Sequence, residues 1–255
     1  MIITRPADQG AETAEAVKRD GGVPLVLPMI RILPPEDTAE CDAALHEPGS
    51  FHGVVFASTN AVEGFYARAQ ALGIDMGPWR KVPAFAVGPK TADALGRHGV
   101  TAVEIAAHAT GAALGAMLGS RDIRGKRFLL PRGSRARDEI AAALAAAGAL
   151  AIPVVVYRTV GPDAATADAM RSAVMSAERK AILFASPSAV VEWVHLFTQK
   201  ELQETAAGRI VVAIGQTTAA AAAAHGIHVH AVAAEATDSS MVGALGACLR
   251  VPAGN

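Results

Sequence analysis

The sequence predicts an α/β fold of two lobes that arose by internal duplication, and the duplication is visible as a repeat. Matching residues recur at a fixed offset of 127 positions (215 − 88) along the 255-residue chain. The matched pairs are Arg5 and Arg132, Gly21 and Gly148, Gly88 and Gly215, and Thr91 and Thr218. This period is far longer than that of a solenoid repeat, so the chain consists of two diverged copies of one domain-sized unit.

Short apolar runs alternate with helical patterns in each copy. The runs at residues 54–57 and 84–87 are continuously apolar, which is typical of parallel strands buried on both faces. Regular alternation of such strands with helices implies right-handed βαβ units in an open, doubly wound sheet. We therefore expect two flavodoxin-like parallel-sheet lobes joined by two linkers.

The elements of the first copy follow from these patterns in order. Strands are predicted at residues 2–4, 23–27, 54–57, 84–87 and 102–105. Helices are predicted at residues 10–20, 60–72, 89–98 and 110–118. Gly21, Gly73 and Gly99 end the first three helices, since glycine readily adopts the left-handed conformation of a C-cap. In the second copy, Gly148 ends a helix before a strand at residues 154–156.

Two proline-marked segments, residues 30–37 and 157–163, are the predicted linkers. Both lie inside the repeat units, so the lobes need not be contiguous halves of the chain. One lobe can contain residues 37–157, and the other can contain residues 1–33 and 162–255. Composition alone leaves a simple tandem arrangement equally open.

Composition and charge exclude several classes of function. The net charge is −1, there is no basic tract and aromatic residues make up 4%, so we expect no nucleic-acid partner. Residues 140–157 are uncharged, but Gly148 and Pro153 interrupt them, and we expect no membrane segment. The N-terminus lacks a signal-peptide pattern, and Cys41 and Cys248 form no disulfide framework, which together favour the cytoplasm.

Ligands of open α/β sheets bind at the carboxyl ends of the strands, so residues that follow the predicted strands are candidate binding residues. They are Ser58, Thr59, Asn60, Gly88, Lys90 and Thr91 in the first copy, and Ser186, Pro187, Ser188, Gly215, Thr217 and Thr218 in the second. Such turns present free N–H groups to an anion. Serine and threonine are also preferred helix N-caps, which leaves a purely structural role open.

Three further side chains are candidates because of where they stand. Arg5 and Arg132 follow the first strand of their copies, where each can bind a ligand carboxylate or form an ion pair at the strand end. Tyr157 ends a strand where a linker begins, and it can act as a proton donor or as a packing residue.

Common cofactor and catalytic motifs are missing. No glycine-rich nucleotide loop follows a predicted strand, and no serine has the glycine pattern of a nucleophile elbow. His225, His228 and His230 have no cysteine or carboxylate beside them, so we expect no metal.

Six motifs in order resemble the uroporphyrinogen-III synthase family. They are Thr4-Arg5-Pro6 and the segments at residues 56–62, 86–92, 155–159, 184–190 and 213–219. The resemblance implies the exchanged arrangement of lobes with a deep cleft, and a cofactor-free lyase. This lyase would dehydrate and cyclise hydroxymethylbilane with inversion of the terminal pyrrole ring, giving uroporphyrinogen III. It also implies binding by main-chain groups at these motifs, and Tyr157 as the acid for loss of water.

The expected partner is therefore hydroxymethylbilane, bound by a monomer. Two other classes of function stay open on the residues alone. One is a non-enzymatic, two-lobed protein that binds a small molecule. The other is an α/β enzyme that uses a nucleotide.

Overall fold

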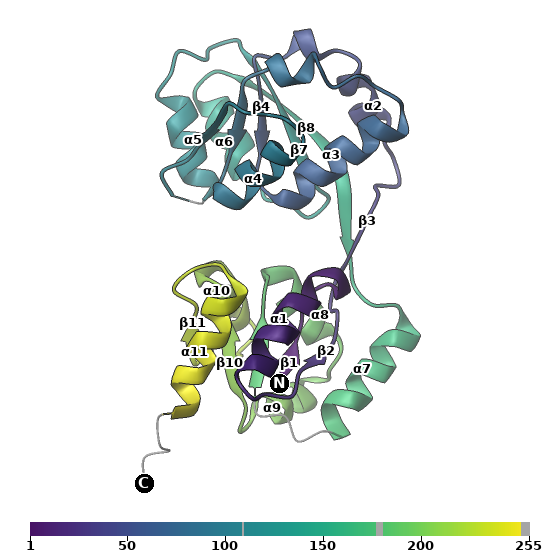
Figure 1. The fold of residues 1–255 in the computed structure, drawn as a ribbon, viewed down its shortest axis with the longest axis vertical. Coiled ribbons are helices and arrows are strands. Elements are labelled where there is room, and N and C mark those ends of the chain that lie inside the picture. Colours follow the sequence, from purple (N-terminus) through teal and green to yellow (C-terminus); the bar gives the residue numbers. More distant parts are fainter. Residues whose placement is uncertain (109, 177–180, 251–255) are drawn as a thin grey trace. The chain divides into compact units, whose positions relative to one another are not determined.

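The computed structural model describes residues 1–108, 110–176 and 181–250 (Figure 1). The chain forms two compact units. The terminal unit contains Met1–Arg31 and Val160–Asn255, and the inserted unit contains Ile32–Thr159. Residues 177–180 and 251–255 of the expected discontinuous lobe lie outside the described residues.

The sheet of the terminal unit has the strand order β2-β1-β9-β10-β11, with parallel neighbours throughout. Its strands are β1 (Ile2–Ile3), β2 (Leu25–Val26), β9 (Ala181–Phe184), β10 (Ile210–Ala213) and β11 (Ala231–Val232). Numbered along the unit, this order is 2-1-3-4-5, the order of flavodoxin-like sheets.

The sheet of the inserted unit has the order β3-β8-β7-β4-β5-β6. Its strands are β3 (Arg31–Leu33), β4 (Gly53–Phe56), β5 (Ala84–Ala86), β6 (Val103–Ile105), β7 (Arg127–Gly133) and β8 (Leu150–Val160). The strands from β8 to β6 pair in parallel, and they give the order 2-1-3-4-5 when the unit is read from β7. The predicted flavodoxin-like, parallel-sheet fold is therefore confirmed.

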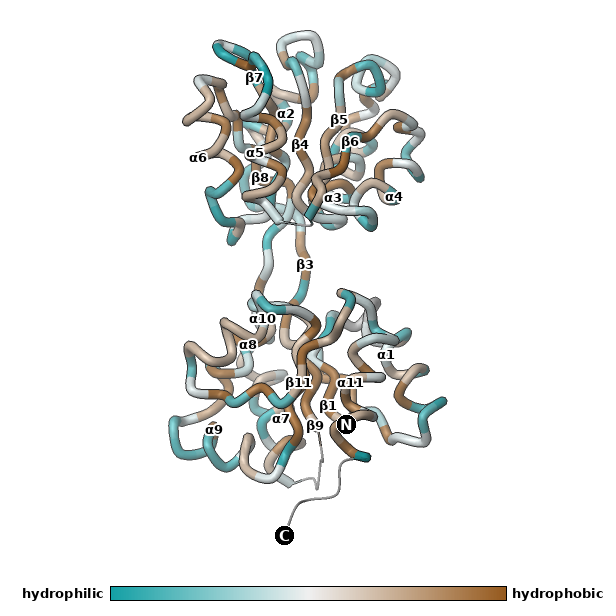
Figure 2. Tube along the Cα trace, turned by 90° about the vertical axis from the view of Figure 1, so that its left-hand side faces the viewer, coloured by the Kyte–Doolittle hydropathy of each residue, from teal (hydrophilic) through white to brown (hydrophobic). Residues whose placement is uncertain are grey.

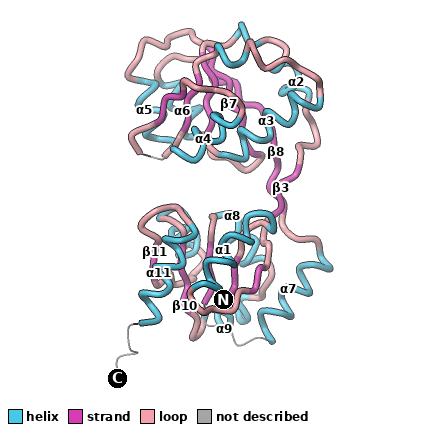
Figure 3. The backbone as a smooth tube through the Cα atoms, viewed as in Figure 1, coloured by secondary structure: helices cyan, strands magenta, loops and turns pink. Residues whose placement is uncertain are grey.

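Helices cover both faces of each sheet (Figure 3). The terminal unit has α1 (Ala7–Arg19), α7 (Ala164–Ser176), α8 (Pro187–His195), α9 (Gln199–Ala206), α10 (Gln216–Ala224) and α11 (Asp238–Arg250). The inserted unit has α2 (Ala39–Leu45), α3 (Thr59–Ala71), α4 (Pro89–Arg97), α5 (Gly111–Gly119) and α6 (Glu139–Ala146), with short 3₁₀ helices at Pro48–Ser50 and Trp79–Lys81.

Consecutive strand residues supply the cores on the two faces, because side chains alternate along a strand. In the terminal unit, Ile182 packs with Trp193 of α8, whereas Leu183 packs with Met241 of α11. In the inserted unit, Val54 lies in the core beneath α3 and Val55 in the core beneath α5 and α6. Burial on both faces explains the continuous apolar runs, which are brown in Figure 2.

The segments predicted as linkers contain more regular structure than expected. Residues 31–33 form β3, which neighbours β8, and β8 continues past Tyr157 to Val160. β3 ends before Pro34, because proline has no N–H group with which to continue a strand ladder. Arg132, expected after its strand, lies within β7. Helices α2, α7 and α9 are absent from the predicted elements.

Gly64 lets α3 approach the backbone of β8 closely. A Cβ atom at this position would lie 2.6 Å from the Val156 carbonyl oxygen. We predict that Gly64→Ala lowers the free energy of unfolding by about 1–2 kcal/mol, because the overpacking outweighs the gain in helix propensity. Gly96→Ala in α4 is the control, since nothing lies within 4 Å of its added methyl group. Urea titration that finds both variants equally stable would contradict this account.

Candidate functional site

The carboxyl ends of the parallel strands gather the expected residues on one edge of each sheet. In the inserted unit, β4 leads to Ser58 and β5 leads to Gly88, while Arg132 and Tyr157 lie near the ends of β7 and β8. Each expected residue therefore lies on the edge where α/β sheets bind ligands.

The terminal unit repeats this arrangement on its own edge. β1 leads to Arg5, β9 leads to Ser186 and β10 leads to Gly215. β1 and β9 are the neighbouring strands at which the strand order reverses. In the inserted unit the corresponding pair is β7 and β4. Such reversals leave a crevice at the sheet edge, and this is the usual ligand position in the fold.

Four helices begin at the expected binding residues. Ser58 caps α3 by accepting the Ala61 N–H at 3.2 Å, and Ser186 caps α8 by accepting the Ala189 N–H at 3.1 Å. Gly88 and Gly215 are the N-cap residues of α4 and α10. The first turns of these helices contain Thr59 and Asn60, Lys90 and Thr91, Pro187 and Ser188, and Thr217 and Thr218. N–H groups and the positive end of the helix dipole thus lie at each edge.

The side chains of these first turns differ in burial. Lys90 and Thr217 are exposed, and Asn60 is partly exposed. Thr91 and Thr218 are buried, with 6% and 3% of their surface accessible. Their hydroxyl groups therefore belong to the packed interior, and only the backbone around them lies at the edge.

Both arginines contact carboxylates of the chain itself. Arg5 forms an ion pair of 2.7 Å with Asp238 at the start of α11, and Thr13 donates to the same carboxylate at 2.8 Å. The side chains of Arg5 and Asp238 are only 13% and 11% exposed, respectively. Arg132 contacts the Asp138 carboxylate at 2.5 Å and also donates to the Ala136 carbonyl oxygen. The structure therefore gives each arginine a structural contact at its strand end.

Tyr157 lies on the α3 side of its sheet because of a shift in strand register. Val154 and Val156 both pack in the core beneath α3, so strict alternation would place Tyr157 on the opposite face. The register between β7 and β8 shifts at Arg132/Gly133, and Tyr157 packs against the same core as Val156. Such irregularities re-aim side chains next to functional sites. The Tyr157 hydroxyl lies 3.4 Å from Ser58 Oγ.

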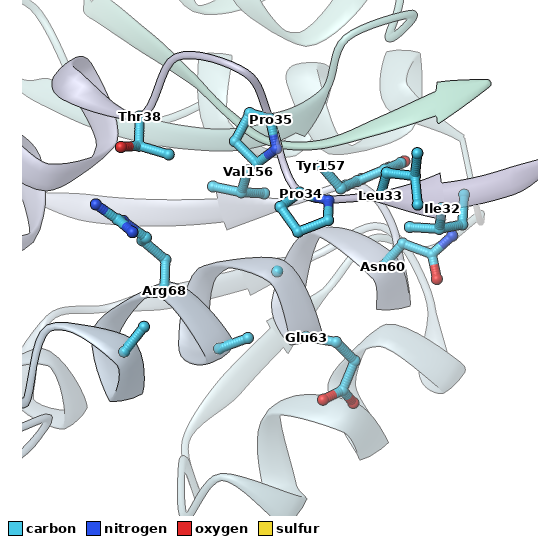
Figure 4. Close-up of a pocket in the computed structure, with 13 residues that line it drawn as sticks. Ile32, Leu33, Pro34, Pro35, Thr38, Asn60, Glu63, Arg68, Val156 and Tyr157 are labelled. Carbon is cyan, nitrogen blue, oxygen red and sulfur yellow. The ribbon is translucent and has the colours of Figure 1, made fainter.

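A pocket of about 380 Å³ lies beside Tyr157 (Figure 4). It is formed by β3 and the segment after it, by one side of α3 and by β8 at Val156 and Tyr157. Its lining residues are Ile32, Leu33, Pro34, Pro35, Thr38, Asn60, Glu63, Gly64, Ala67, Arg68, Ala71, Val156 and Tyr157. Of these, only Asn60 and Tyr157 are among the expected site residues. The spacing of Gly64, Ala67 and Ala71 on one helix face was the available sequence signal for a groove.

The charged end of this pocket is neutralised. Arg68 donates to both carboxylate oxygens of Asp42 at 2.6 Å. Those hydrogen bonds hold the pKa of the Asp42 carboxyl below its ordinary value. Arg68 and Thr38 lie at one end of the pocket, and Asn60 lies towards the other end (Figure 4). The pocket therefore offers mainly apolar walls near Tyr157, and the Glu63 carboxylate that also lines it is paired with Arg97 and His98.

Two further classes of site are not found in the part of the chain that the structure describes. No group of three histidine, cysteine or carboxylate side chains is placed to hold a metal ion among residues 1–108, 110–176 and 181–250. Over the same residues, no helix combines the length and apolar character needed to cross a membrane.

Comparisons with known proteins agree on one family. The family model for uroporphyrinogen-III synthase HemD matches residues 11–243. A uroporphyrinogen-III synthase from Chlorobaculum parvum is 26% identical over 230 residues, which cover 90% of each chain. One from Synechococcus elongatus is 30% identical over 173 residues, or 67% of this chain and 64% of that protein. The crystal structure of a mutant uroporphyrinogen III synthase from Thermus thermophilus superposes with a TM-score of 0.73, at 21% identity, covering 98% of both chains.

The ion pairs of the two arginines should contribute differently to stability. Asp238→Ala removes a largely buried carboxylate that contacts Arg5 and Thr13, and we predict a loss of about 1–3 kcal/mol in unfolding free energy. Asp138 is 81% exposed, so Asp138→Ala should cost below about 1 kcal/mol. Urea unfolding followed by tryptophan fluorescence measures both, because Trp193 reports on the terminal unit and Trp79 on the inserted unit. Equal losses in the two variants would contradict the prediction.

Proposed function

The chain belongs to the uroporphyrinogen-III synthase family, and we propose that it is the lyase that converts hydroxymethylbilane into uroporphyrinogen III. The observation that carries this proposal is the family match over residues 11–243, which confirms the resemblance seen in the sequence motifs. In this reaction the linear tetrapyrrole loses water from its terminal hydroxymethyl group. Its last pyrrole ring is inverted through a spiro intermediate, and the macrocycle closes.

Tyr157 is the proposed acid for loss of water. As the C–O bond of the hydroxymethyl group breaks, the phenol O–H donates its proton to the departing oxygen, and water leaves. A phenol O–H is a proton donor on an uncharged side chain. The phenolate regains a proton when the last ring loses one during closure. The pocket that Tyr157 helps to line supports this role, since it provides space with apolar walls beside the residue.

Main-chain groups at the helix N-termini are the proposed partners of the substrate carboxylates. The substrate carries acetate and propionate side chains, and helix N-termini attract anions through free N–H groups and the helix dipole. Ser58 to Asn60, Gly88 to Thr91, Ser186 to Ser188 and Gly215 to Thr218 supply such groups. The side chains of Arg5 and Arg132 are assigned a smaller share of carboxylate binding, because both already contact aspartates of the chain.

The protein is further proposed to be a cytoplasmic monomer. Cys41 and Cys248 are free thiols, which fits a reducing compartment. Among the described residues, the large exposed apolar side chains, such as Val23, Ile105 and Leu150, come from different segments of the chain. Light scattering should therefore report the mass of a single chain, and a dimer mass would contradict this part of the proposal.

The direct test of function is incubation of the protein with freshly generated hydroxymethylbilane. The products are oxidised, and the isomers are separated and counted. Formation of the type III isomer faster than in buffer supports the proposal. A mixture identical to that of the uncatalysed reaction, in which the unrearranged isomer dominates, would contradict it.

Tyr157→Phe tests the acid. The variant keeps the ring and its packing but lacks the donor, so we predict that type III formation slows by about 10²–10⁴-fold. The unrearranged isomer should then dominate, because spontaneous closure continues.

The control is Tyr66→Phe. Tyr66 is the only other tyrosine of the chain, and it lies 9% exposed in the core with its ring stacked on His98. Rates are compared at matched concentrations of folded protein. A wild-type rate in Tyr157→Phe would leave Tyr157 as a packing residue.

A further inference from the structure

The Tyr157 hydroxyl is held against the first turn of α3. Its contact there is Ser58 Oγ, at 3.4 Å. Ser58 is the N-cap of the helix, and its Oγ accepts the Ala61 N–H at 3.2 Å. The phenol, the serine hydroxyl and a backbone N–H of α3 therefore form one connected row of polar groups.

Gly133 allows the Tyr157 side chain to reach Ser58. Tyr157 belongs to β8 and Ser58 follows β4, and β7 lies between these two strands. Neighbouring strands are about 4.8 Å apart, so the ring has to cross the backbone of β7. It does so at Gly133, where an added Cβ would lie 2.5 Å from Cζ and 2.8 Å from the hydroxyl oxygen. The Ser134 N–H also donates to the Tyr157 carbonyl oxygen at 3.0 Å.

Electrostatics decides which hydroxyl donates. A serine hydroxyl has one proton and two lone pairs, and the Ala61 N–H uses one lone pair of Ser58. The N-terminus of α3 carries partial positive charge, which favours oxygen lone pairs facing the helix and protons facing away from it. Either hydroxyl of this contact can donate, and the charge of the helix N-terminus favours Ser58 as the donor to the phenol oxygen. The phenol proton is then left to point away from α3.

We propose that Ser58 is a positioning residue for Tyr157, which orients the phenol proton away from α3 and stabilises the phenolate that remains after the proton is donated. This inference rests on the proposed function, and it assigns Ser58 a role that differs from binding the substrate through its side chain. Gly133 is the second part of the arrangement, because it leaves the space that the ring occupies.

The repeat provides an internal comparison. Ser186 caps α8 with the same geometry as Ser58 caps α3. The offset of 127 positions, however, matches Tyr157 with Ile30, a buried aliphatic residue. A capping serine is thus common to both units, whereas its contact with a phenol occurs at the edge of the inserted unit. The contact with Tyr157 is therefore separable from helix capping.

Variants at Ser58 separate capping from orientation. Ser58→Gly removes the hydroxyl, but glycine is itself a tolerated N-cap, so α3 should remain folded. We expect type III formation to slow about tenfold, as for loss of one hydrogen bond to a reacting group. Ser58→Thr keeps a hydroxyl and should stay within about twofold of the wild-type rate. Thr198→Gly, which alters the N-cap of α9, is the matched control and should not change the rate.

A double variant distinguishes positioning from direct binding. If Ser58 acts through the phenol hydroxyl, Ser58→Gly should have no further effect in the Tyr157→Phe background. An equal slowing in both backgrounds would show that Ser58 contacts the substrate by itself, and it would overturn the proposal.

A spectroscopic measurement tests the contact without any activity. The chain has two tyrosines, so protein labelled with ¹³C at the tyrosine Cζ gives two signals, and Tyr157→Phe assigns them. Ser58→Gly and Gly133→Ala should both move the Tyr157 signal and leave the Tyr66 signal in place, whereas Thr198→Gly and Gly96→Ala should move neither. An unmoved Tyr157 signal in Ser58→Gly would overturn the inference even if the wild-type chain forms the type III isomer. Failure of the wild-type chain to form that isomer would instead overturn the proposed function.

Discussion

Parallel pairing between a strand of one repeat and a strand of the other is the constraint on which both units depend. β1 pairs with β9 in the terminal unit, and β7 pairs with β4 in the inserted unit. These pairs are also the points at which the strand order reverses. Since parallel strands end on the same edge, each pairing brings residues of both repeats together, as with Arg5 and Ser186 in the terminal unit. Neither unit can form its edge from one repeat alone.

The parts of the fold that could be predicted are those whose cause is local. β4 and β5 are buried on both faces, so they appear in the sequence as continuous apolar runs, and Ser58 and Ser186 follow strands directly as N-caps. β3 has no such signal, because residues 31–33 become a strand only by pairing with β8, which is more than a hundred positions away. The same limit applies to the Arg5 ion pair, whose partner Asp238 comes from the other end of the chain.

The candidate site shows this limit most clearly at Tyr157. Its place on an apolar strand could be predicted, and this made it a candidate proton donor, but the strand does not end at Tyr157 as expected and continues to Val160. The direction of its side chain could not be predicted, because it depends on the register shift between β7 and β8. Simple alternation after Val154 and Val156 would point the ring to the wrong face of the sheet. The groove formed by Gly64, Ala67 and Ala71 likewise requires the segment after β3 to cover it.

The proposed reaction explains why so few charged side chains are needed at this edge. The proposed substrate carries several carboxylates, and an ionised aspartate or glutamate next to the departing hydroxyl would repel them. A phenol can donate a proton there without adding a negative charge beforehand. Arg68 is paired with Asp42, and Arg132 with Asp138, so the edge of the inserted unit offers anions the exposed Lys90 and the partial charges of helix N-termini. Fixed backbone groups of this kind can restrict the conformation of the bilane. Such restriction allows inversion of the last ring to compete with closure of the macrocycle without inversion. The proposed reaction then needs only one well-oriented proton donor at this edge. Its rate should therefore depend on how accurately Gly133 and Ser58 position the Tyr157 ring.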